Sequence, residues 1–196
     1  MKLIGITGGV GMGKSTAQSL LEARRLPVID TDQLARDLVA PGQVALQEIA
    51  TAFGSGVLRN DGALRRKELA QIVFSDPQAR RRLESILHPR IREAWSATVM
   101  DWRRDQLDFG AVVIPLLFET DTPSSFDATV CVACSPETQR ERLEARGWTC
   151  DEIRGRLAAQ WPVEKKIAAA EFVIWTDGDL EVHATQWDHV LRRMGA

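Results

Sequence analysis

Five short runs of apolar residues recur along the chain, and within them apolar and polar positions do not alternate. Uninterrupted runs of this kind are typical of parallel strands, because helices cover both faces of a parallel sheet. Longer segments with helical spacing of apolar residues lie between the runs. The pattern predicts an α/β fold of three layers around a five-stranded parallel sheet, with strands at residues 3–7, 26–30, 111–118, 128–132 and 172–175.

The helices between these runs carry recognisable start and stop residues. Ser135 and Pro136 offer an N-cap followed by proline at the first helical position, and Gly147 indicates where that helix ends. Thr149 and Glu152 have the spacing of a capping box. They predict a further helix whose apolar residues fall four apart: Ile153, Leu157 and Trp161.

The segment between the second and third predicted strands differs from the rest of the chain. It contains no convincing strand and is rich in arginine and helix formers, which predicts a helical insertion. Within it Ser75-Asp76-Pro77 restarts a helix, and His88-Pro89 is expected to interrupt the next one. The chain is therefore predicted to be a single domain composed of a core (1–32, 106–134 and 167–196), the insertion (33–105) and a lid region (135–166).

A complete phosphate-binding motif follows the first predicted strand. Residues 8–15 read GGVGMGKS, which fits G-x-x-x-x-G-K-[ST] in full, with a helix expected directly after it. Glycines let backbone N–H groups turn inward around phosphate oxygens, and the helix N-terminus adds partial positive charge. In such a loop Lys14 would span the β- and γ-phosphates and the Ser15 hydroxyl would ligate Mg²⁺. The residues expected to bind a nucleoside triphosphate are Gly9, Val10, Gly11, Met12, Gly13, Lys14, Ser15 and Thr16.

Two carboxylates, Asp30 and Asp32, end the second predicted strand. Strand side chains alternate, so both are expected on the same side, at the sheet edge where α/β proteins bind ligands. Asp32 there can accept a proton from a substrate hydroxyl or help to place Mg²⁺. It can equally well act as the N-cap of a helix at residues 33–38. Position alone leaves these alternatives open for Asp32, and for Asp30 it leaves open magnesium placement or structural hydrogen bonding.

Composition and charge narrow the possible partners. The chain has 196 residues, 44% hydrophobic residues and a net charge of −2, which argues against a general nucleic-acid binder. No run approaches the roughly 20 apolar residues that cross a bilayer, so we expect no membrane association and a cytoplasmic location. Cys131 and Cys134 form a lone pair without a second ligand pair, which favours packing over a zinc site.

Several segments together make the chain resemble the dephospho-coenzyme A kinase family. Besides the phosphate-binding loop, they occur in family order from residue 3 to about residue 178. They are Asp30-Thr31-Asp32 with Leu34-Ala35-Arg36, then His88-Pro89-Arg90-Ile91, Ile114-Pro115-Leu116-Leu117-Phe118-Glu119, and Gln160 with Glu164-Lys165-Lys166. The resemblance implies a P-loop NTPase fold with a helical coenzyme A-binding region and a lid. It also implies ATP-dependent phosphorylation of the ribose 3′-hydroxyl of dephospho-coenzyme A, the last step of coenzyme A biosynthesis, with Asp32 as general base.

Basic residues supply the remaining candidates. Arg142 and Arg146 lie four apart, on one helix face, and are expected to stabilise charge on the transferring phosphates; a solvated helix face is the alternative. Arg65 is a candidate contact for the substrate pyrophosphate, although surface charge is the commoner explanation for such basic runs. His88 is expected to orient substrate or to act structurally. No role is predicted for Arg140.

The chain departs from the family pattern at the end of the last strand, and three other functions are alternatives. The family commonly places an asparagine near adenine at the end of the last strand, where this chain has Thr176-Asp177, so the sequence does not predict how adenine is bound. A regulatory GTPase would need an Asn-Lys-x-Asp sequence, and none occurs. A non-catalytic module would be expected to lose Lys14, Ser15 or the acidic pair. Another small nucleotide, nucleoside or metabolite kinase is the remaining alternative, and a monomer or weak homo-oligomer is expected.

Overall fold

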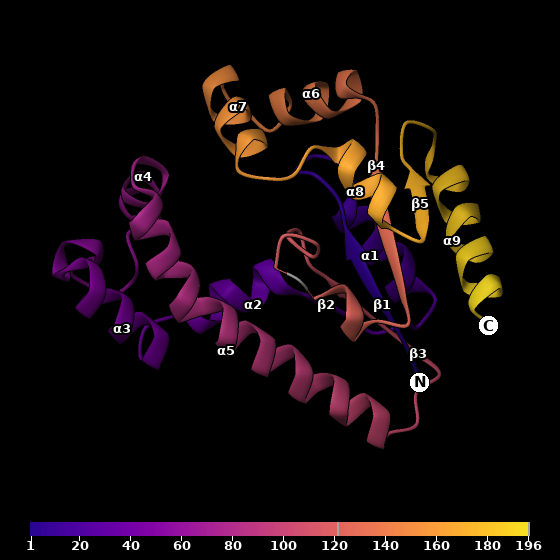
Figure 1. Ribbon diagram of the computed structural model, residues 1–196, viewed down its shortest axis with the longest axis horizontal. Helices are drawn as coiled ribbons and strands as arrows, with labels where there is room; N and C mark the ends of the chain where they lie inside the picture. Colours follow the sequence, from indigo (N-terminus) through magenta and orange to yellow (C-terminus); the bar gives the residue numbers. More distant parts are fainter. Residues whose placement is uncertain (121, 196) are drawn as a thin grey trace. The chain divides into compact units, whose positions relative to one another are not determined.

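The computed structural model describes residues 1–120 and 122–195, which divide into two compact units. The sheet unit is Met1–Asp30 with Trp102–Ala196, and the helical unit is Thr31–Asp101. Figure 1 shows the strands in the first and a group of helices in the second. Asp121 and Ala196, which belong to the predicted core, lie outside the described residues. The predicted domain limits and the binding role of residues 33–105 stay predictions.

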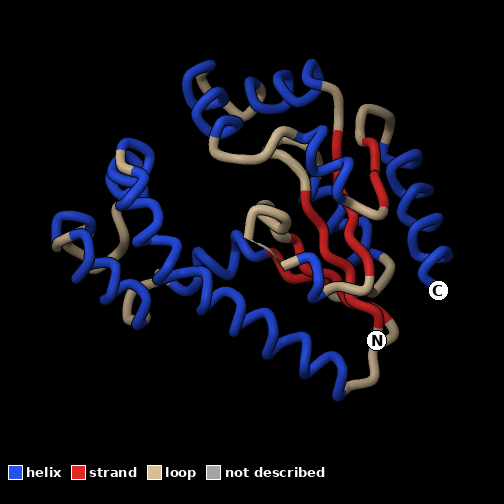
Figure 2. Tube along the Cα trace, viewed as in Figure 1, coloured by secondary structure: helices blue, strands red, loops and turns tan. Residues whose placement is uncertain are grey.

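The sheet is parallel throughout and has the strand order β2-β3-β1-β4-β5 (Figure 2). The strands are β1 (Lys2–Thr7), β2 (Val28–Asp30), β3 (Phe109–Val113), β4 (Ala128–Ala133) and β5 (Phe172–Trp175). The first strand of the chain lies in the middle: Ile4 pairs with Ala111 on one side and with Ala128 on the other. The predicted five-stranded parallel sheet is confirmed.

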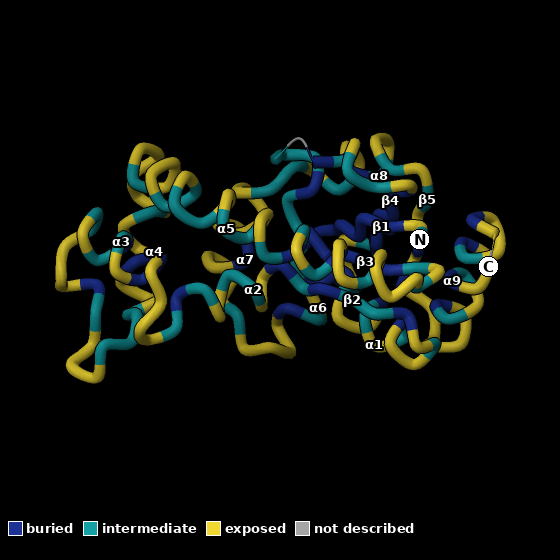
Figure 3. The backbone as a smooth tube through the Cα atoms, turned by 90° about the horizontal axis from the view of Figure 1, so that it is seen from below, coloured by how far each residue is buried: buried dark blue, intermediate teal, exposed yellow. Residues whose placement is uncertain are grey.

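Helices cover both faces of this sheet. On one face α1 (Lys14–Ala23) and α9 (Leu180–Met194) pack against apolar side chains from every strand, and Trp187 of α9 is completely buried there. On the other face α8 (Val163–Ala169) lies against β4. Figure 3 shows the result, with the backbone of β1 drawn as buried between the layers. Uninterrupted apolar strands are the expected outcome of such double coverage.

The cap residues predict the starts of two helices correctly, with one error in length. Ser135 Oγ accepts a hydrogen bond from Thr138 N–H at 3.2 Å and starts α6 (Pro136–Glu144). Thr149 and Glu152 form the capping box of α7 (Cys150–Ala158). The prediction that Trp161 continues this helix is wrong. Because Pro162 disfavours helical conformation in the residue before it, the helix ends before Trp161.

The third strand is shorter than its apolar run predicts. It ends at Val113, whereas the run continues to Phe118. Pro115 has no N–H to donate to a neighbouring strand, and Leu117 N–H instead closes a turn onto Ile114 O at 3.2 Å. Leu117 is nevertheless completely buried. The apolar side chain of Leu117 is therefore explained by its burial in a turn and does not indicate a longer strand.

The helical unit has a small core of its own. Its elements are α2 (Thr31–Leu38), α3 (Val44–Phe53), the short 3₁₀ helix η1 (Ser55–Val57), α4 (Arg66–Ser75) and α5 (Pro77–Arg104), whose last residues belong to the sheet unit. Buried Val39, Leu46, Ile49, Val57 and Leu69 form this core. An isolated antiparallel bridge joins Leu58 to Leu64. The prediction that this segment consists of helices is confirmed.

Helix α5 contradicts the expectation that His88-Pro89 breaks a helix. The helix runs through Pro89 without interruption. A proline inside a helix loosens the preceding turn, and its carbonyl groups then need other donors. Arg90 Nη1 donates to Ile86 O at 2.7 Å, and Arg90 Nη2 lies 2.5 Å from Glu48 Oε1 on α3. The Arg90 side chain thus supplies a donor within the turn that the proline weakens.

The sheet unit also buries a histidine whose neutral form is favoured. His183 on α9 is 3% exposed, and its Nε2 has no hydrogen-bond partner among the described residues. Burial lowers the pKa of His183 below its ordinary value of 6.5, and the positive charge of Arg142 lowers it further. The unfolded chain therefore binds more protons than the folded protein at pH values between these two pKa values.

We predict that the free energy of unfolding decreases as the pH is lowered from about 7 to about 5, because unfolding then frees His183 to take up a proton. In His183→Gln this dependence should be smaller, since glutamine does not titrate. Urea unfolding of both proteins across this range measures the difference. Asp177, whose pKa is also lowered, titrates below its ordinary value of 3.8 and so outside the range. Equal slopes for the two proteins would contradict the assignment to His183.

Candidate functional site

The phosphate-binding loop lies at the carboxyl end of the central strand. It connects β1 to α1, which begins at Lys14 directly after Gly13. Gly8 has φ +147°, and a Cβ atom there would lie 2.2 Å from Val132 O on β4. Gly13 is the N-cap of α1 in a left-handed conformation with φ +94°. Glycine is therefore required at both ends of the loop by contacts and backbone angles seen in the structure.

The loop presents hydrogen-bond donors and positive charge together. The first turn of α1 has no acidic side chain and no side-chain cap, so its partial positive charge is not neutralised locally. Lys14 Nζ donates to Gly8 O and Gly9 O, both at 2.8 Å. Ser15 and Thr16 are exposed in the same turn. Every residue predicted to bind nucleotide lies in this loop or turn: Gly9, Val10, Gly11, Met12, Gly13, Lys14, Ser15 and Thr16.

The end of β5 is tied directly to the loop. Thr176 Oγ1 donates to Met12 O at 3.1 Å. Arg142 on α6 donates to Thr176 twice, from Nη1 to Oγ1 at 2.8 Å and from Nη2 to the backbone oxygen at 2.5 Å. Thr176 stands where an asparagine was expected, and here it links strand, helix and loop. The role predicted for Arg142 at the transferring phosphates stays a prediction.

Asp177, beside Thr176, joins the same strand end to the start of α6. Its carboxylate accepts hydrogen bonds from Ser135 N–H at 3.0 Å and Ser135 Oγ at 2.7 Å. Burial alone would raise the pKa of Asp177, but hydrogen bonds from Thr138 and Ser135, with the charge of Arg142, outweigh it and lower the pKa. Asp177 therefore stays ionised at neutral pH and holds α6 at the end of the sheet.

The two other arginines of this region lie near the end of α6. Arg140 is exposed, and its Nε lies 4.0 Å from Glu144 Oε1. Arg146 is exposed in the turn that follows α6, just before Gly147. Gly147 has φ +79°, as expected where a helix stops. The prediction that Arg146 contacts transferring phosphates is neither supported nor contradicted by these positions.

A buried ion pair lies behind the loop, at the carboxyl end of β3. Lys166 of α8 is completely buried, and its Nζ lies 2.8 Å from Glu119 Oε1 and 2.5 Å from Pro115 O. Thr7 Oγ1, at the end of β1, donates to the same Pro115 oxygen at 3.1 Å. Lys166 thereby connects α8 to the turn that follows β3, and Thr7 connects the same turn to the end of β1. The sequence predicts no role for Glu119 or Lys166, because the two residues are 47 positions apart and no local spacing reveals the pair.

The local backbone changes the interpretation of the acidic pair. Strand β2 ends at Asp30 and α2 begins at the next residue, Thr31. The prediction that Asp30 and Asp32 lie on the same side assumed that both belong to one strand. That assumption is wrong, because α2 begins between them and the alternation of strand side chains does not continue into a helix. Asp32 is exposed in the first turn of α2, and Asp30 occupies the position before it, where an N-cap stands. The alternative that Asp32 itself caps the helix is therefore wrong.

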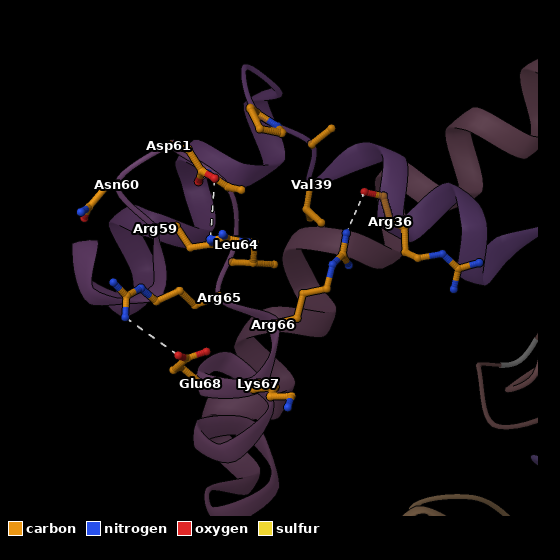
Figure 4. A pocket seen from close by; sticks show the side chains of 13 residues that line it. Arg36, Val39, Arg59, Asn60, Asp61, Leu64, Arg65, Arg66, Lys67 and Glu68 are labelled. Carbon is orange, nitrogen blue, oxygen red and sulfur yellow. Dashed lines mark hydrogen bonds and ion pairs between the residues drawn. The ribbon is translucent and has the colours of Figure 1, made fainter. Parts of the chain in front are cut away.

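The helical unit contains an open pocket of about 900 Å³ rich in positive charge (Figure 4). Five basic side chains line it together with the acidic residues Asp61 and Glu68. Figure 4 shows them on α2, on the segment before α4 and on the first turn of α4, around Val39 and Leu64. The basic residues are Arg36, Arg59, Arg65, Arg66 and Lys67.

Two predicted substrate contacts fall in this unit in different settings. Arg65 lines the pocket, where its Nε donates to Leu58 O at 2.8 Å and its Nη1 lies 3.9 Å from Glu68 Oε1. Part of its side chain thus holds the bridge between Leu58 and Leu64. His88 is exposed on α5 and is not one of the residues that line this pocket. Substrate contacts of both residues stay predictions.

The side chains of the sheet unit could hold a metal ion only if bound phosphate supplied some of its ligands. Residues 1–120 and 122–195 hold no group of three or more His, Cys, Asp or Glu side chains placed to bind a metal. The Ser15 hydroxyl is a hard oxygen donor at the start of α1, which fits an ion that shares its other ligands with phosphates and water. Within the same residues no helix has the length and apolar character needed to cross a membrane.

Two glutamines contact the loop, although the sequence predicted neither contact: Gln139 was not singled out, and Gln160 was named only within the family resemblance. Gln139 on α6 is buried and donates from Nε2 to Val10 O at 2.7 Å. Gln160 lies between α7 and α8 and accepts from Val10 N–H at 3.3 Å. Their partners are more than a hundred residues away in the sequence. No spacing signal in the sequence identifies either contact.

Comparison with known proteins gives a consistent result. The model of a family described as dephospho-CoA kinase matches residues 2–181. A protein named dephospho-CoA kinase from Bdellovibrio bacteriovorus is 40% identical, over 98% of this chain and 96% of its own length. Another of that name from Anaeromyxobacter dehalogenans is 46% identical, over 97% of this chain and 91% of its own length.

Solved structures agree with these matches. TT1252 from Thermus thermophilus superimposes with a TM-score of 0.83 and 33% identity, over all of this chain and 98% of its own. A dephospho-CoA kinase from Campylobacter jejuni gives 0.71 at 21% identity, over 98% of this chain and 96% of its own. A shikimate kinase from Bacteroides thetaiotaomicron gives 0.51 at 14% identity, over 97% of this chain and 98% of its own. The last two similarities show the fold alone.

We predict that Lys166→Met lowers the free energy of unfolding by about 3–5 kcal/mol, because it leaves the Glu119 carboxylate partly buried without its cation. Urea denaturation monitored by circular dichroism measures this loss. The double variant Glu119→Gln, Lys166→Met removes both charges and should recover part of the stability. A loss below about 1 kcal/mol in the single variant would show that the pair is not the anchor its burial indicates.

Proposed function

Since the chain belongs to the dephospho-CoA kinase family, we propose that it transfers the terminal phosphoryl group of ATP to the ribose 3′-hydroxyl of dephospho-coenzyme A. The products are coenzyme A and ADP, and the reaction is the last step of coenzyme A biosynthesis. One observation carries the proposal: a complete phosphate-binding loop at the central strand of a chain that matches the family from residue 2 to residue 181.

Lys14 and the first turn of α1 form the donor site. When triphosphate binds, the Lys14 ammonium exchanges its backbone partners Gly8 O and Gly9 O for phosphate oxygens, a stronger charge-assisted contact. The N–H groups of the turn surround the same oxygens. Ser15 would hold Mg²⁺, which supplies charge neutralisation to the phosphates when bound. The residues themselves position the donor and lower the cost of the charge that develops during transfer.

Asp32 is the proposed general base. It is an exposed carboxylate in the first turn of α2, directly after a strand that ends at the ligand-binding edge of the sheet. As the 3′-oxygen bonds to the γ-phosphorus, the bond to the ADP oxygen breaks and the hydroxyl proton passes to the Asp32 carboxylate.

The basic pocket of the helical unit is the proposed site for the pyrophosphate of the acceptor. Dephospho-coenzyme A carries two phosphate charges, and the five cations around the pocket exceed its two acidic residues. Arg65 is one of the cations proposed to contact the pyrophosphate, since its guanidinium lies on the wall of the pocket. His88 is proposed to orient the acceptor from α5.

Arg142 and Arg146 are proposed to stabilise the transferring phosphoryl group when the lid region closes. Their contribution would be charge on the equatorial oxygens, added to that of Lys14. Arg142 would have to exchange at least one of its hydrogen bonds to Thr176 for this contact. Its two bonds to Thr176 also support a second role, in which it fixes the strand end where adenine would lie.

The cellular setting is proposed from the thiols. Cys131, Cys134 and Cys150 are free, and burial raises the pKa of Cys131 to about 11, so that thiol is poorly reactive. Free cysteines suit a reducing compartment such as the cytoplasm. A monomer or weak homo-oligomer stays a prediction.

The test is a panel of acceptors incubated with the protein, ATP and Mg²⁺, with products identified by mass spectrometry. We expect phosphate on dephospho-coenzyme A and not on shikimate, nucleosides or nucleoside monophosphates. Lys14→Ala should lower the rate by ~10²–10³, because it removes one electrostatic contact to the transferring group. Faster transfer to another acceptor than to dephospho-coenzyme A would contradict the proposed substrate. A rate for Lys14→Ala close to that of the parent would contradict the proposed donor site.

We predict that Asp32→Asn lowers turnover by ~10²–10⁴, since asparagine retains size but cannot accept the hydroxyl proton. Steady-state kinetics with dephospho-coenzyme A measures the loss. Asp37→Asn, on the same helix, is the matched control and should stay within about twofold of the parent. The melting temperature of Asp32→Asn should change little. Parent-like turnover in Asp32→Asn would exclude Asp32 as the base.

A further inference from the structure

Both backbone polar groups of Val10, in the phosphate-binding loop, are held by glutamine side chains. Gln139 Nε2 donates to Val10 O at 2.7 Å, and Val10 N–H donates to Gln160 Oε1 at 3.3 Å. The two glutamines come from either side of α7, one on α6 and the other just after α7. The peptide groups on both sides of Val10 are therefore held by residues of the lid region.

The two hydrogen bonds differ in length, and the two glutamine side chains differ in how closely the surrounding residues pack against them. Gln139 is 7% exposed, on the face of α6 that packs against the loop, and a Cβ at Gly9 would lie 3.2 Å from its Nε2. Its bond to Val10 is short. The Gln160 contact lies slightly beyond the usual 2.7–3.2 Å range of N–H···O bonds. A small shift of the backbone at residue 160 would therefore strengthen or break the hydrogen bond between Gln160 and Val10.

The backbone next to Gln160 is anchored to the buried ion pair. Trp161 N–H donates to Glu119 Oε1 at 2.9 Å, the same oxygen that lies 2.8 Å from Lys166 Nζ. The Trp161 ring is stacked with Phe118, with centroids 6.4 Å apart, and the Lys165 ammonium lies 3.4 Å from its centroid. These contacts fix residue 161 at the end of β3.

Helix α7, on the other side of Gln160, has little to hold it. Ile153 is its one buried residue among the nine, and the turn before the helix contains Gly147 with φ +79°. A helix with few buried contacts opens and moves at low free-energy cost. Gln160 thus stands between a helix with little buried surface and a fixed anchor, with its amide oxygen accepting from the phosphate-binding loop.

We propose that Gln160 is a positioning residue that sets the orientation of the Val10 peptide, and hence the shape of the loop around the ATP phosphates. The Glu119–Lys166 pair holds the backbone from which the Gln160 side chain reaches Val10. Movement of α7 is passed through Gln160 to the loop, so that lid closure and donor alignment are coupled. The kinetic part of this proposal rests on the proposed kinase function, whereas the contact with Val10 does not.

The contact itself is tested by NMR on protein labelled with ¹⁵N-valine. Val10→Ile removes one signal and so assigns the Val10 amide. In Gln160→Leu, which loses the acceptor, the Val10 amide proton should move upfield, whereas Gln160→Glu, which retains an acceptor oxygen, should leave it close to its parental position. An unchanged Val10 signal in Gln160→Leu would overturn the proposal whether or not the protein is a kinase.

The consequence for catalysis is tested with the same variant. Gln160→Leu should lower kcat/KM for ATP by roughly three- to tenfold, the fold-change that corresponds to one neutral hydrogen bond. The KM for dephospho-coenzyme A should stay within about twofold of the parent, since the contact concerns the donor site. Gln18→Leu, the same substitution on the exposed part of α1, is the control and should behave as the parent.

Two further outcomes decide the proposal. If Gln160→Leu does not fold, Gln160→Met carries both measurements, because methionine has the same length without an amide oxygen. A kcat/KM for ATP within twofold of the parent in a folded variant overturns the positioning role. An equal loss in Gln18→Leu also overturns it, since the effect is then not specific to the contact with Val10.

Discussion

The carbonyl oxygen of Val132 fills the space in which any side chain at residue 8 would have to lie. A Cβ atom at residue 8 would lie 2.2 Å from this oxygen, so only glycine fits at the position where the chain leaves β1. From that point the loop turns back, places Gly13 at the start of α1 and directs the unneutralised N-terminus of the helix towards the loop. The anion-binding chemistry of the molecule thus depends on a contact between two adjacent strands.

Around this contact the ends of the strands are linked to one another by polar groups. The Pro115 carbonyl accepts from Lys166 and Thr7, and Thr176 joins β5 to Met12 of the loop. Each link satisfies a backbone carbonyl group in a loop or turn that follows a strand. A loop shaped by glycines has little stability of its own, and the polar links give it a defined position without side chains at the binding surface.

Features governed by neighbouring residues were predictable from the sequence. The phosphate-binding loop, the caps at Ser135 and Thr149 and the strands of the sheet depend on local patterns, and the structure confirms them. The errors in helix and strand limits arose at prolines, whose effect on the backbone differs from one place to the next. Pro115 ends the third strand within an apolar run, and the Arg90 side chain supports a helix through Pro89. The contacts of Gln139, Gln160 and Thr176 join positions more than a hundred residues apart, and no pattern in a single sequence predicts them.

The order of the strands also has a consequence for how the chain is made. The central strand is synthesised before the other strands of the sheet, and its partners β3 and β4 follow roughly 100 residues later. At typical elongation rates of about 5–20 residues per second, Leu3, Ile4 and Ile6 remain exposed for about 5–20 seconds. The nascent chain therefore carries an unpaired apolar strand until β3 and β4 have been synthesised. During that interval β1 is exposed to association with other apolar segments, which a partner strand later prevents.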